Sequence, residues 1–83
     1  MKVTIHSPIK KIFEGEAKEV ILPGEDGEFS VMDFHQPCLY RLRAGQAKVT
    51  LRRELDGELE KRFSLREGLA NVAHDKIIMM IED

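Results

Sequence analysis

This 83-residue sequence has no tryptophan, one tyrosine and a single cysteine, Cys38. One cysteine cannot form an internal disulfide, which excludes a small secreted domain held together by disulfides. No apolar run approaches the ~20 residues that cross a bilayer, and the first residues lack the apolar core of a secretory signal. We therefore expect no segment inserted into a membrane, and an intracellular location.

Helical periodicity is also missing, because no window of about 12 residues repeats its apolar positions at the spacing of a helix. Apolar and polar residues instead alternate in short segments separated by turn residues, which is typical of half-buried strands. The predicted strands cover residues 2–6, 17–22, 38–42, 46–53, 59–65, 69–73 and 76–81, with a further alternation beginning at Phe29 and Val31. We predict an all-β fold, a small flattened β-sandwich or barrel of short antiparallel strands, in one domain over residues 1–83.

The segments 46–53 and 59–65 predict a hairpin whose loop has an odd number of residues. An even loop would send the two apolar sets to opposite faces, because side chains alternate along a strand. A three-residue loop over 55–57, with Gly57 in the left-handed conformation, predicts the pairs Val49–Phe63, Ala47–Leu65 and Arg52–Glu60. The last strand, 76–81, is apolar on both faces, so we expect it to be buried in the interior.

The net charge of −2 is distributed unevenly along the chain. Residues 41–66 carry eight basic and four acidic side chains, which fits either a solvated outer face or a docking patch. A small β-barrel that binds nucleic acid is therefore an alternative function. Single-strand binding needs exposed aromatic rings, yet the basic zone contains only Phe63, which the hairpin places inward. We expect no nucleic-acid partner.

The sequence offers no catalytic, cofactor or metal site. His6, His35 and His74 lie on separate segments without ligand spacing, and no basic neighbour in the sequence favours a reactive thiol at Cys38. The run 25–28 is acidic but lacks the spacing of a calcium-binding loop, so it is a solvated turn or an acidic docking tip. The six glycines are scattered and make no phosphate-binding loop.

A corner in residues 22–45 carries a family resemblance. An apolar strand ends at Leu22 before Pro23 and Gly24, and a short polar turn closes at Gly27. The residues that follow the pattern are Leu22, Pro23, Gly24, Gly27, Phe29, Val31, His35, Pro37, Leu39, Leu42 and Gly45. This layout resembles the amino-terminal β-sandwich of the epsilon subunit of F-type ATP synthases. The sequence departs from the family at three places. Ser30 stands where the family usually has a glycine, and residues 33–34 replace the family's Pro-Gly. Residues 67–68 stand in place of a paired-glycine turn.

The resemblance implies a non-catalytic rotor subunit in the central stalk, which couples rotation of the c-ring to the gamma subunit during proton-driven ATP synthesis. It implies a protein that is a monomer when isolated and that acts at the cytoplasmic face of the bacterial inner membrane as part of the complex. Family members commonly continue into a pair of carboxy-terminal helices associated with inhibition of hydrolysis and with ATP binding. This sequence contains no such pair, so we expect neither property.

The resemblance also implies where partners bind. The family's c-ring contact falls on Glu28, and its gamma contact falls on Ser7, His35 and Tyr40. Met32 and Phe34 are further possible interface residues, because an acidic tip beside apolar side chains suits a site that attracts a basic loop and then holds it.

Overall fold

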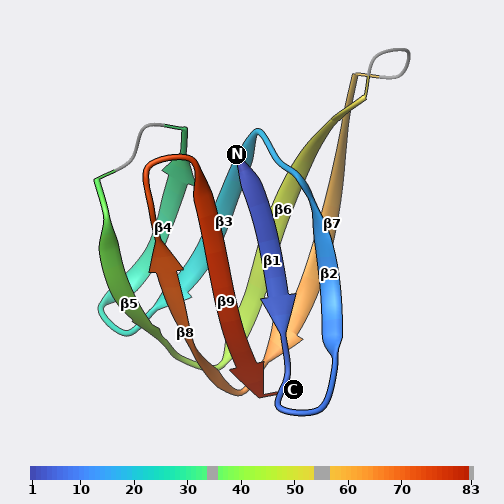
Figure 1. Cartoon of the computed structure of the whole chain (residues 1–83). Helices are drawn as coiled ribbons and strands as arrows, with labels where there is room; N and C mark the ends of the chain where they lie inside the picture. Colours follow the sequence, from blue (N-terminus) through green and yellow to red (C-terminus); the bar gives the residue numbers. More distant parts are fainter. Residues whose placement is uncertain (34–35, 54–56, 83) are drawn as a thin grey trace.

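The computed structural model describes residues 1–33, 36–53 and 57–82. These residues form nine strands and no helix, which confirms the predicted all-β fold (Figure 1). The strands are β1 (Lys2–His6), β2 (Lys11–Glu16), β3 (Glu19–Gly24), β4 (Gly27–Met32), β5 (Cys38–Leu42), β6 (Gly45–Arg53), β7 (Gly57–Leu65), β8 (Glu67–Val72) and β9 (Lys76–Glu82). Strand β2 was not predicted, and β8 begins two residues earlier than expected.

The strands form two facing layers. Layer A has the order β2-β1-β9-β8-β5, and layer B has the order β4-β3-β6-β7. The pair Gly24–Leu42, between β3 and β5, joins the layers into one curled sheet. On the opposite side Phe13 of β2 packs against Phe63 of β7, with ring centroids 5.3 Å apart. All strand pairs of the described chain are antiparallel except β1 and β9, and layer A lies in front of layer B in Figure 1.

The core fills the space between the layers, because alternate residues of each strand point inward. In layer A, Val3 pairs with Ile77 and Ile5 pairs with Met79 across the parallel strands β1 and β9. All four side chains are fully buried. Layer B contributes Val20, Leu22, Val31, Ala47, Val49 and Leu65. Burying an aliphatic side chain of this size stabilises the fold by about 1.5–3 kcal/mol, so this alternation supplies most of the stabilisation.

The corner differs from the prediction. Strand β3 does not end at Leu22 but continues through Pro23 to Gly24, and residues 25–26 alone make the turn into β4. Pro23 pairs with Glu28 at a position whose backbone groups point away from β4. The missing N–H of proline therefore costs no hydrogen bond in this hairpin.

The β6–β7 hairpin confirms the odd loop but shifts the predicted register. The pairs are Ala47–Phe63, Val49–Lys61 and Arg52–Glu58, so the predicted Ala47–Leu65, Val49–Phe63 and Arg52–Glu60 are wrong. The reason is that β6 continues to Arg53 and β7 begins at Gly57. The midpoint of the connection therefore lies one residue earlier than predicted, so each residue of β6 pairs with a residue of β7 that is two positions earlier in the chain. Gly57 has the predicted positive φ, at 85°. Residues 55 and 56 of the predicted loop lie outside the described residues.

Strand β9 is buried on one face only, which corrects the prediction of burial on both faces. Ile77, Met79 and Ile81 point into the core, whereas Ile78 is 39% exposed and Met80 is 47% exposed. The physical reason is that layer B covers the inner side of layer A, and no described part of the chain covers the outer side.

Candidate partner-binding surfaces

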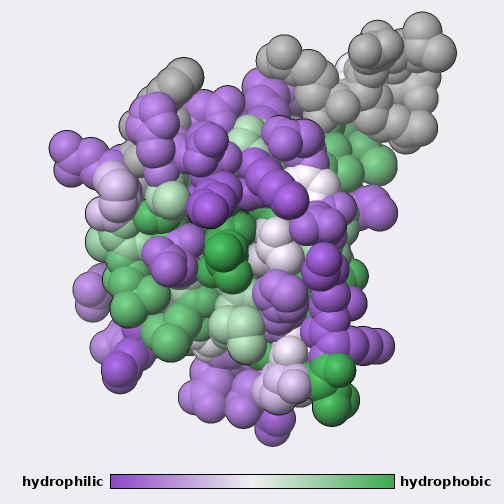
Figure 2. Space-filling view, in the orientation of Figure 1, coloured by the Kyte–Doolittle hydropathy of each residue, from purple (hydrophilic) through white to green (hydrophobic). Residues whose placement is uncertain are grey.

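The outer face of layer A carries four large apolar side chains, which we call the outer patch: Leu39 of β5, Leu69 of β8, and Ile78 and Met80 of β9. Leu69 and Met80 are direct cross-strand neighbours. Figure 2 shows apolar side chains gathered over β5, β8 and β9 on this face, bordered by hydrophilic ones. A cluster of exposed apolar side chains rimmed by polar residues is typical of a protein interface.

The sequence contains a signal for the outer patch. Leu39 and Leu69 fall out of phase with the inward-pointing residues of their strands, so they place apolar side chains on the outer face. The two-sided apolar pattern of β9 predicts burial on both faces, which is its usual meaning in parallel sheets. Out-of-phase apolar residues on three neighbouring strands indicate a second, partner-covered face instead.

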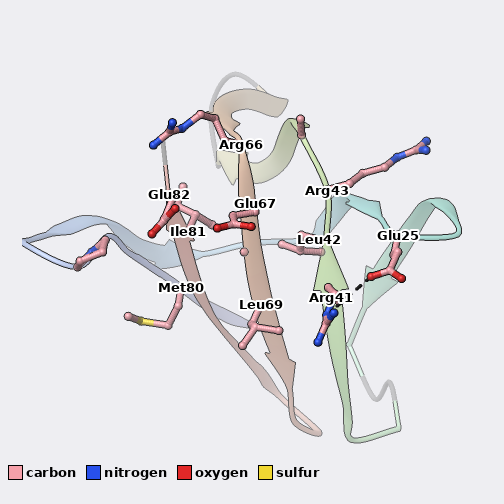
Figure 3. A pocket seen from close by; sticks show the side chains of 13 residues that line it. Glu25, Arg41, Leu42, Arg43, Arg66, Glu67, Leu69, Met80, Ile81 and Glu82 are labelled. Carbon is pink, nitrogen blue, oxygen red and sulfur yellow. Dashed lines mark ion pairs between the residues drawn. The ribbon is translucent and has the colours of Figure 1, made fainter.

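A cleft of about 630 Å³ continues from the outer patch toward the end of layer A where Arg43 and Arg66 lie. Figure 3 shows Leu69 between Met80 and Arg41. The Nε of Arg41 lies 3.7 Å from Oε2 of Glu25. Three arginines, at 41, 43 and 66, are balanced by three glutamates, at 25, 67 and 82. Because this lining is neutral overall, it suits the mixed side chains of a protein better than a phosphate group.

Glu28 lies on layer B, close to the turn between β3 and β4. Its Oε2 is 3.8 Å from the Nζ of Lys48, which reaches it from β6 across β3. A second cleft, of about 510 Å³, separates this turn from β5. Phe29 and Tyr40 form its apolar wall, with ring centroids 4.3 Å apart. The acidic turn predicted from sequence is therefore exposed and borders an apolar cleft.

Tyr40 points from β5 toward the space between the layers and is half-buried. Burial raises the pKa of its hydroxyl above the ordinary value, and the neighbouring Cys38 raises the pKa further. Cys38 is exposed and unpaired with another cysteine. Tyr40 is neutral at physiological pH, and its role at this position is packing against Phe29.

Ser7 is 8% exposed and stabilises the turn between β1 and β2. Its Oγ accepts hydrogen bonds from the N–H groups of Ile9 and Lys10, at 3.4 and 3.2 Å. The turn presents Pro8, Ile9 and Lys10 to solvent, and Ile9 is its most prominent apolar side chain, at 91% exposed.

Met32 is exposed at the far end of β4 from Glu28, about 13 Å away at the usual rise per residue of a strand. The side chains of Met32 and Glu28 both lie on the outer face of β4, so they form one row along the strand. Asp33, which follows, accepts a hydrogen bond of 2.8 Å from the amino group of Met1. Phe34 and His35, the other predicted interface residues of this turn, lie outside the described residues.

The part of the chain that the structure describes contains no candidate metal site. Its His, Cys, Asp and Glu side chains form no group of three that could hold a metal ion. Phe63 is half-buried, and its ring packs against that of Phe13 in β2. Within the same residues, no helix is long and apolar enough to cross a membrane.

Comparison with known proteins identifies ATP synthase epsilon chains as relatives of this chain. The epsilon chain of the ATP synthase of Chlorobium limicola is 35% identical over 82 residues, which are 99% of this chain and 89% of that protein. The epsilon chain from Janthinobacterium sp. (strain Marseille) is 36% identical over 83 residues, and the match spans 56% of its length. The chain therefore spans nearly all of one relative and about half of another.

Solved structures show the same fold. A chain of the mitochondrial ATP synthase of Euglena gracilis superposes with a TM-score of 0.83 at 18% identity, covering 98% of this chain and 49% of that one. A chain of the central stalk and c-ring structure from Tetrahymena thermophila gives a TM-score of 0.81 at 17% identity, covering 100% and 63%. The family of ATP synthase delta/epsilon chain β-sandwich domains matches residues 1–83. Its length and order of strands, its corner motif and these matches together show that the chain belongs to that family.

Proposed function

We propose that this chain is a non-catalytic rotor subunit of a rotary F-type ATP synthase. In this role it couples rotation of the c-ring to the gamma subunit during proton-driven ATP synthesis, and it performs no chemistry itself. The observation that carries the proposal is the outer patch, because a domain of the epsilon family with four large apolar side chains on one outer face is built to be covered by a partner.

The two layers divide the partner contacts of this proposal. Ser7 follows β1 of layer A, whose outer face carries the outer patch, and Tyr40 lies in β5 at the end of the same layer. The outer patch leads us to assign the gamma subunit to the outer side of layer A, with His35 and the half-buried Tyr40 as further contacts at its β5 edge. Glu28 lies in layer B beside the acidic turn and is assigned to the c-ring, while Met32 and Phe34 are possible interface residues.

The same proposal gives the molecule its place in the cell. As a rotor subunit it lies at the cytoplasmic face of the bacterial inner membrane, held there by the complex and not by a segment of its own. It is a monomer when isolated and binds no nucleic acid, since the basic strands β6 and β7 carry no open aromatic ring in the described chain.

The test is copurification of this chain, tagged at its carboxyl end, with the gamma subunit and c-ring of the same genome. The wild type is expected to bring down both. The double variant Leu69→Glu/Met80→Glu should lose gamma, because it places two charges on a face that assembly would bury. Ser64→Glu, on the exposed outer face of layer B, is the matched control and should retain gamma.

Two results would remove the proposal. One is a wild-type chain that copurifies with neither subunit. The other is a folded Leu69→Glu/Met80→Glu variant that retains gamma as well as the control does, because the outer patch would then have no role in assembly. Circular dichroism of both variants verifies that the fold is intact.

A further inference from the structure

Strand β4 has one open edge. Among the described residues it pairs only with β3, and the hairpin is closed by the pair Gly24–Gly27 across a two-residue turn. Starting from that closing pair, the residue pairs of an antiparallel hairpin alternate between pairs that exchange backbone hydrogen bonds and pairs that do not. The backbone N–H and C=O groups of Glu28, Ser30 and Met32 therefore point away from β3, toward the open side.

This edge lacks the features that protect the other edges of the sheet. Edge strands usually carry charges, prolines or bulges that prevent pairing with another chain. Strand β2 has three charged residues among six and pairs with β1 through an irregular register, and β7 has four charged residues among nine. Strand β4 has one charged residue among six, no proline and a continuous register.

Space for an added strand lies beside the first residues of β4, from Gly27 to Phe29. The cleft of about 510 Å³ separates the β3–β4 turn from β5, and its apolar wall is formed by Phe29, Leu39 and Tyr40. Phe29 belongs to β4 itself and points inward. A strand added to β4 would therefore place alternate side chains beside Phe29 and in this cleft, with the intervening ones on the outer face beside Glu28 and Ser30.

The surroundings of the edge are acidic. Five carboxylates lie on or next to the β3–β4 hairpin, namely Glu19, Glu25, Asp26, Glu28 and Asp33, against four cationic groups: Lys18, Arg41, Lys48 and the Met1 amino group. Lys18 pairs with Glu58 of β7, outside the hairpin. The pairs Glu25–Arg41 and Glu28–Lys48 are long, at 3.7 and 3.8 Å, and their carboxylates are exposed, so each is worth little. Ser30 donates its hydroxyl hydrogen to Glu19 without neutralising it.

We propose that the open edge of β4 binds an extended basic segment of a partner protein as an additional strand of layer B. The segment alternates apolar side chains, which enter the cleft beside Phe29, with Lys or Arg side chains on the acidic outer face. A second copy of this chain fits less well, because pairing two β4 edges would bring two acidic hairpins together. The proposal concerns the backbone edge of β4, which the rotor function leaves unassigned, although Glu28 on the outer face of the same strand is assigned above to the c-ring.

The test uses the full chain, labelled with ¹⁵N, and a capped heptapeptide of alternating lysine and valine. Titration monitored by NMR should move the amide signals of Glu28, Ser30 and Met32 first and slow their hydrogen exchange, because these N–H groups gain partners. The matched probe is a heptapeptide of alternating glutamate and valine, which has the same strand propensity and the opposite charge. It should bind at least tenfold more weakly.

Two variants separate backbone pairing from side-chain contact. Ser30→Pro removes the N–H that faces the open edge and leaves the hydrogen-bonding positions of β3 in place, so the lysine peptide should bind at least tenfold more weakly. Ser30→Ala removes only the hydroxyl and should bind as the wild type does. Asp26→Lys tests the charge without touching β4 and should weaken binding several-fold at low salt.

The proposal is overturned if the lysine peptide perturbs β2 or β7 instead of β4, or if the glutamate peptide binds equally well. It is also overturned if a folded Ser30→Pro variant binds as tightly as Ser30→Ala. Sedimentation that shows a wild-type dimer abolished by Ser30→Pro would assign the edge to a second copy of the chain and would likewise overturn it. If Ser30→Pro does not fold, the wild-type amide map and the Asp26→Lys variant still decide the question.

Discussion

Ile77 and Ile78 are neighbours in the chain but have different roles, because they point to opposite faces of β9. Ile77 is fully buried in the core, while Ile78 belongs to the outer patch. Ile77→Ala should lower the free energy of unfolding by about 2–5 kcal/mol, since it leaves a cavity. Ile78→Ala should lower it by less than ~1 kcal/mol, as expected for a partly exposed site. Urea denaturation of the two variants measures the difference, and equal losses would refute the placement of β9.

Gly24 is the residue at which the two layers meet, and it has no room for a side chain. A Cβ there would lie 2.7 Å from the carbonyl oxygen of Gly27 and 2.7 Å from the ring of Phe29. Gly24→Ala should therefore cost about 1–3 kcal/mol of stability through overpacking, measured by thermal or urea unfolding. Gly15→Ala is the control, because its Cβ would meet only the movable ring of Phe13, at 3.0 Å. A smaller loss for Gly24→Ala than for the control would contradict this prediction.

The amino group of Met1 predicts a dependence of stability on alkaline pH. Burial lowers its pKa, but the hydrogen bond and charge of Asp33, together with Glu16, outweigh burial and raise the pKa above the usual 8.0. A raised pKa in the folded state stabilises the fold below the unfolded value, and this contribution is lost as the pH rises through the folded value. Urea unfolding between pH 7 and 10 should show this loss in the wild type.

Asp33→Asn is the control for that measurement. Removing the carboxylate deletes the main partner of the ammonium group. The variant should be less stable than the wild type at pH 7, and the difference between the two should shrink toward pH 10. A difference that stays constant over this range would show that the ion pair does not contribute to stability.

At the scale of strands, alternation of apolar and polar residues predicted most of the elements. It located β1, β5, β6, β7 and β9 closely because each buries one face against the other layer. It did not predict register, since a shift of two residues keeps every side chain on its face. The Ala47–Phe63 pairing was missed for that reason, and its physical basis is the packing of Phe63 on Phe13 of a distant strand.

The outer patch could not be predicted from strand patterns alone, for a related reason. An apolar residue that faces a partner protein has the same sequence pattern as one that faces the core. Only the placement of layer B on the other side of β9 shows that Ile78 and Met80 lie outside the core. The prediction that Glu28 is exposed, by contrast, agrees with the structure, because charged residues next to a turn are rarely buried.

Strand β4 should show alternating protection of its backbone amides. The N–H groups of Phe29 and Val31 bond to β3, whereas that of Ser30 faces the open edge. Hydrogen exchange of the isolated chain followed by NMR should therefore be slow at residues 29 and 31 and markedly faster at residue 30. Uniform protection along β4 would mean that its outer edge is already paired.

At the scale of the whole molecule, we expect the isolated chain neither to hydrolyse ATP nor to bind it tightly. The larger cleft has a neutral lining of three arginines and three glutamates, and the sequence has no glycine-rich phosphate loop. Titration calorimetry should give no heat from a micromolar site, and a phosphate-release assay should remain at background. A micromolar ATP site would contradict this prediction.

The parallel pairing of β1 with β9 has a consequence for how the protein is made. Strand β1 is synthesised first, yet its neighbour in the middle of layer A follows about 70 residues later. At ~5–20 residues per second, roughly 4 to 14 s pass on the ribosome before layer A can close. During that interval β1 has the β2 hairpin on one side and lacks the strand that flanks it on the other. The parallel pairing of β1 with β9 is therefore one of the last contacts that this fold can form.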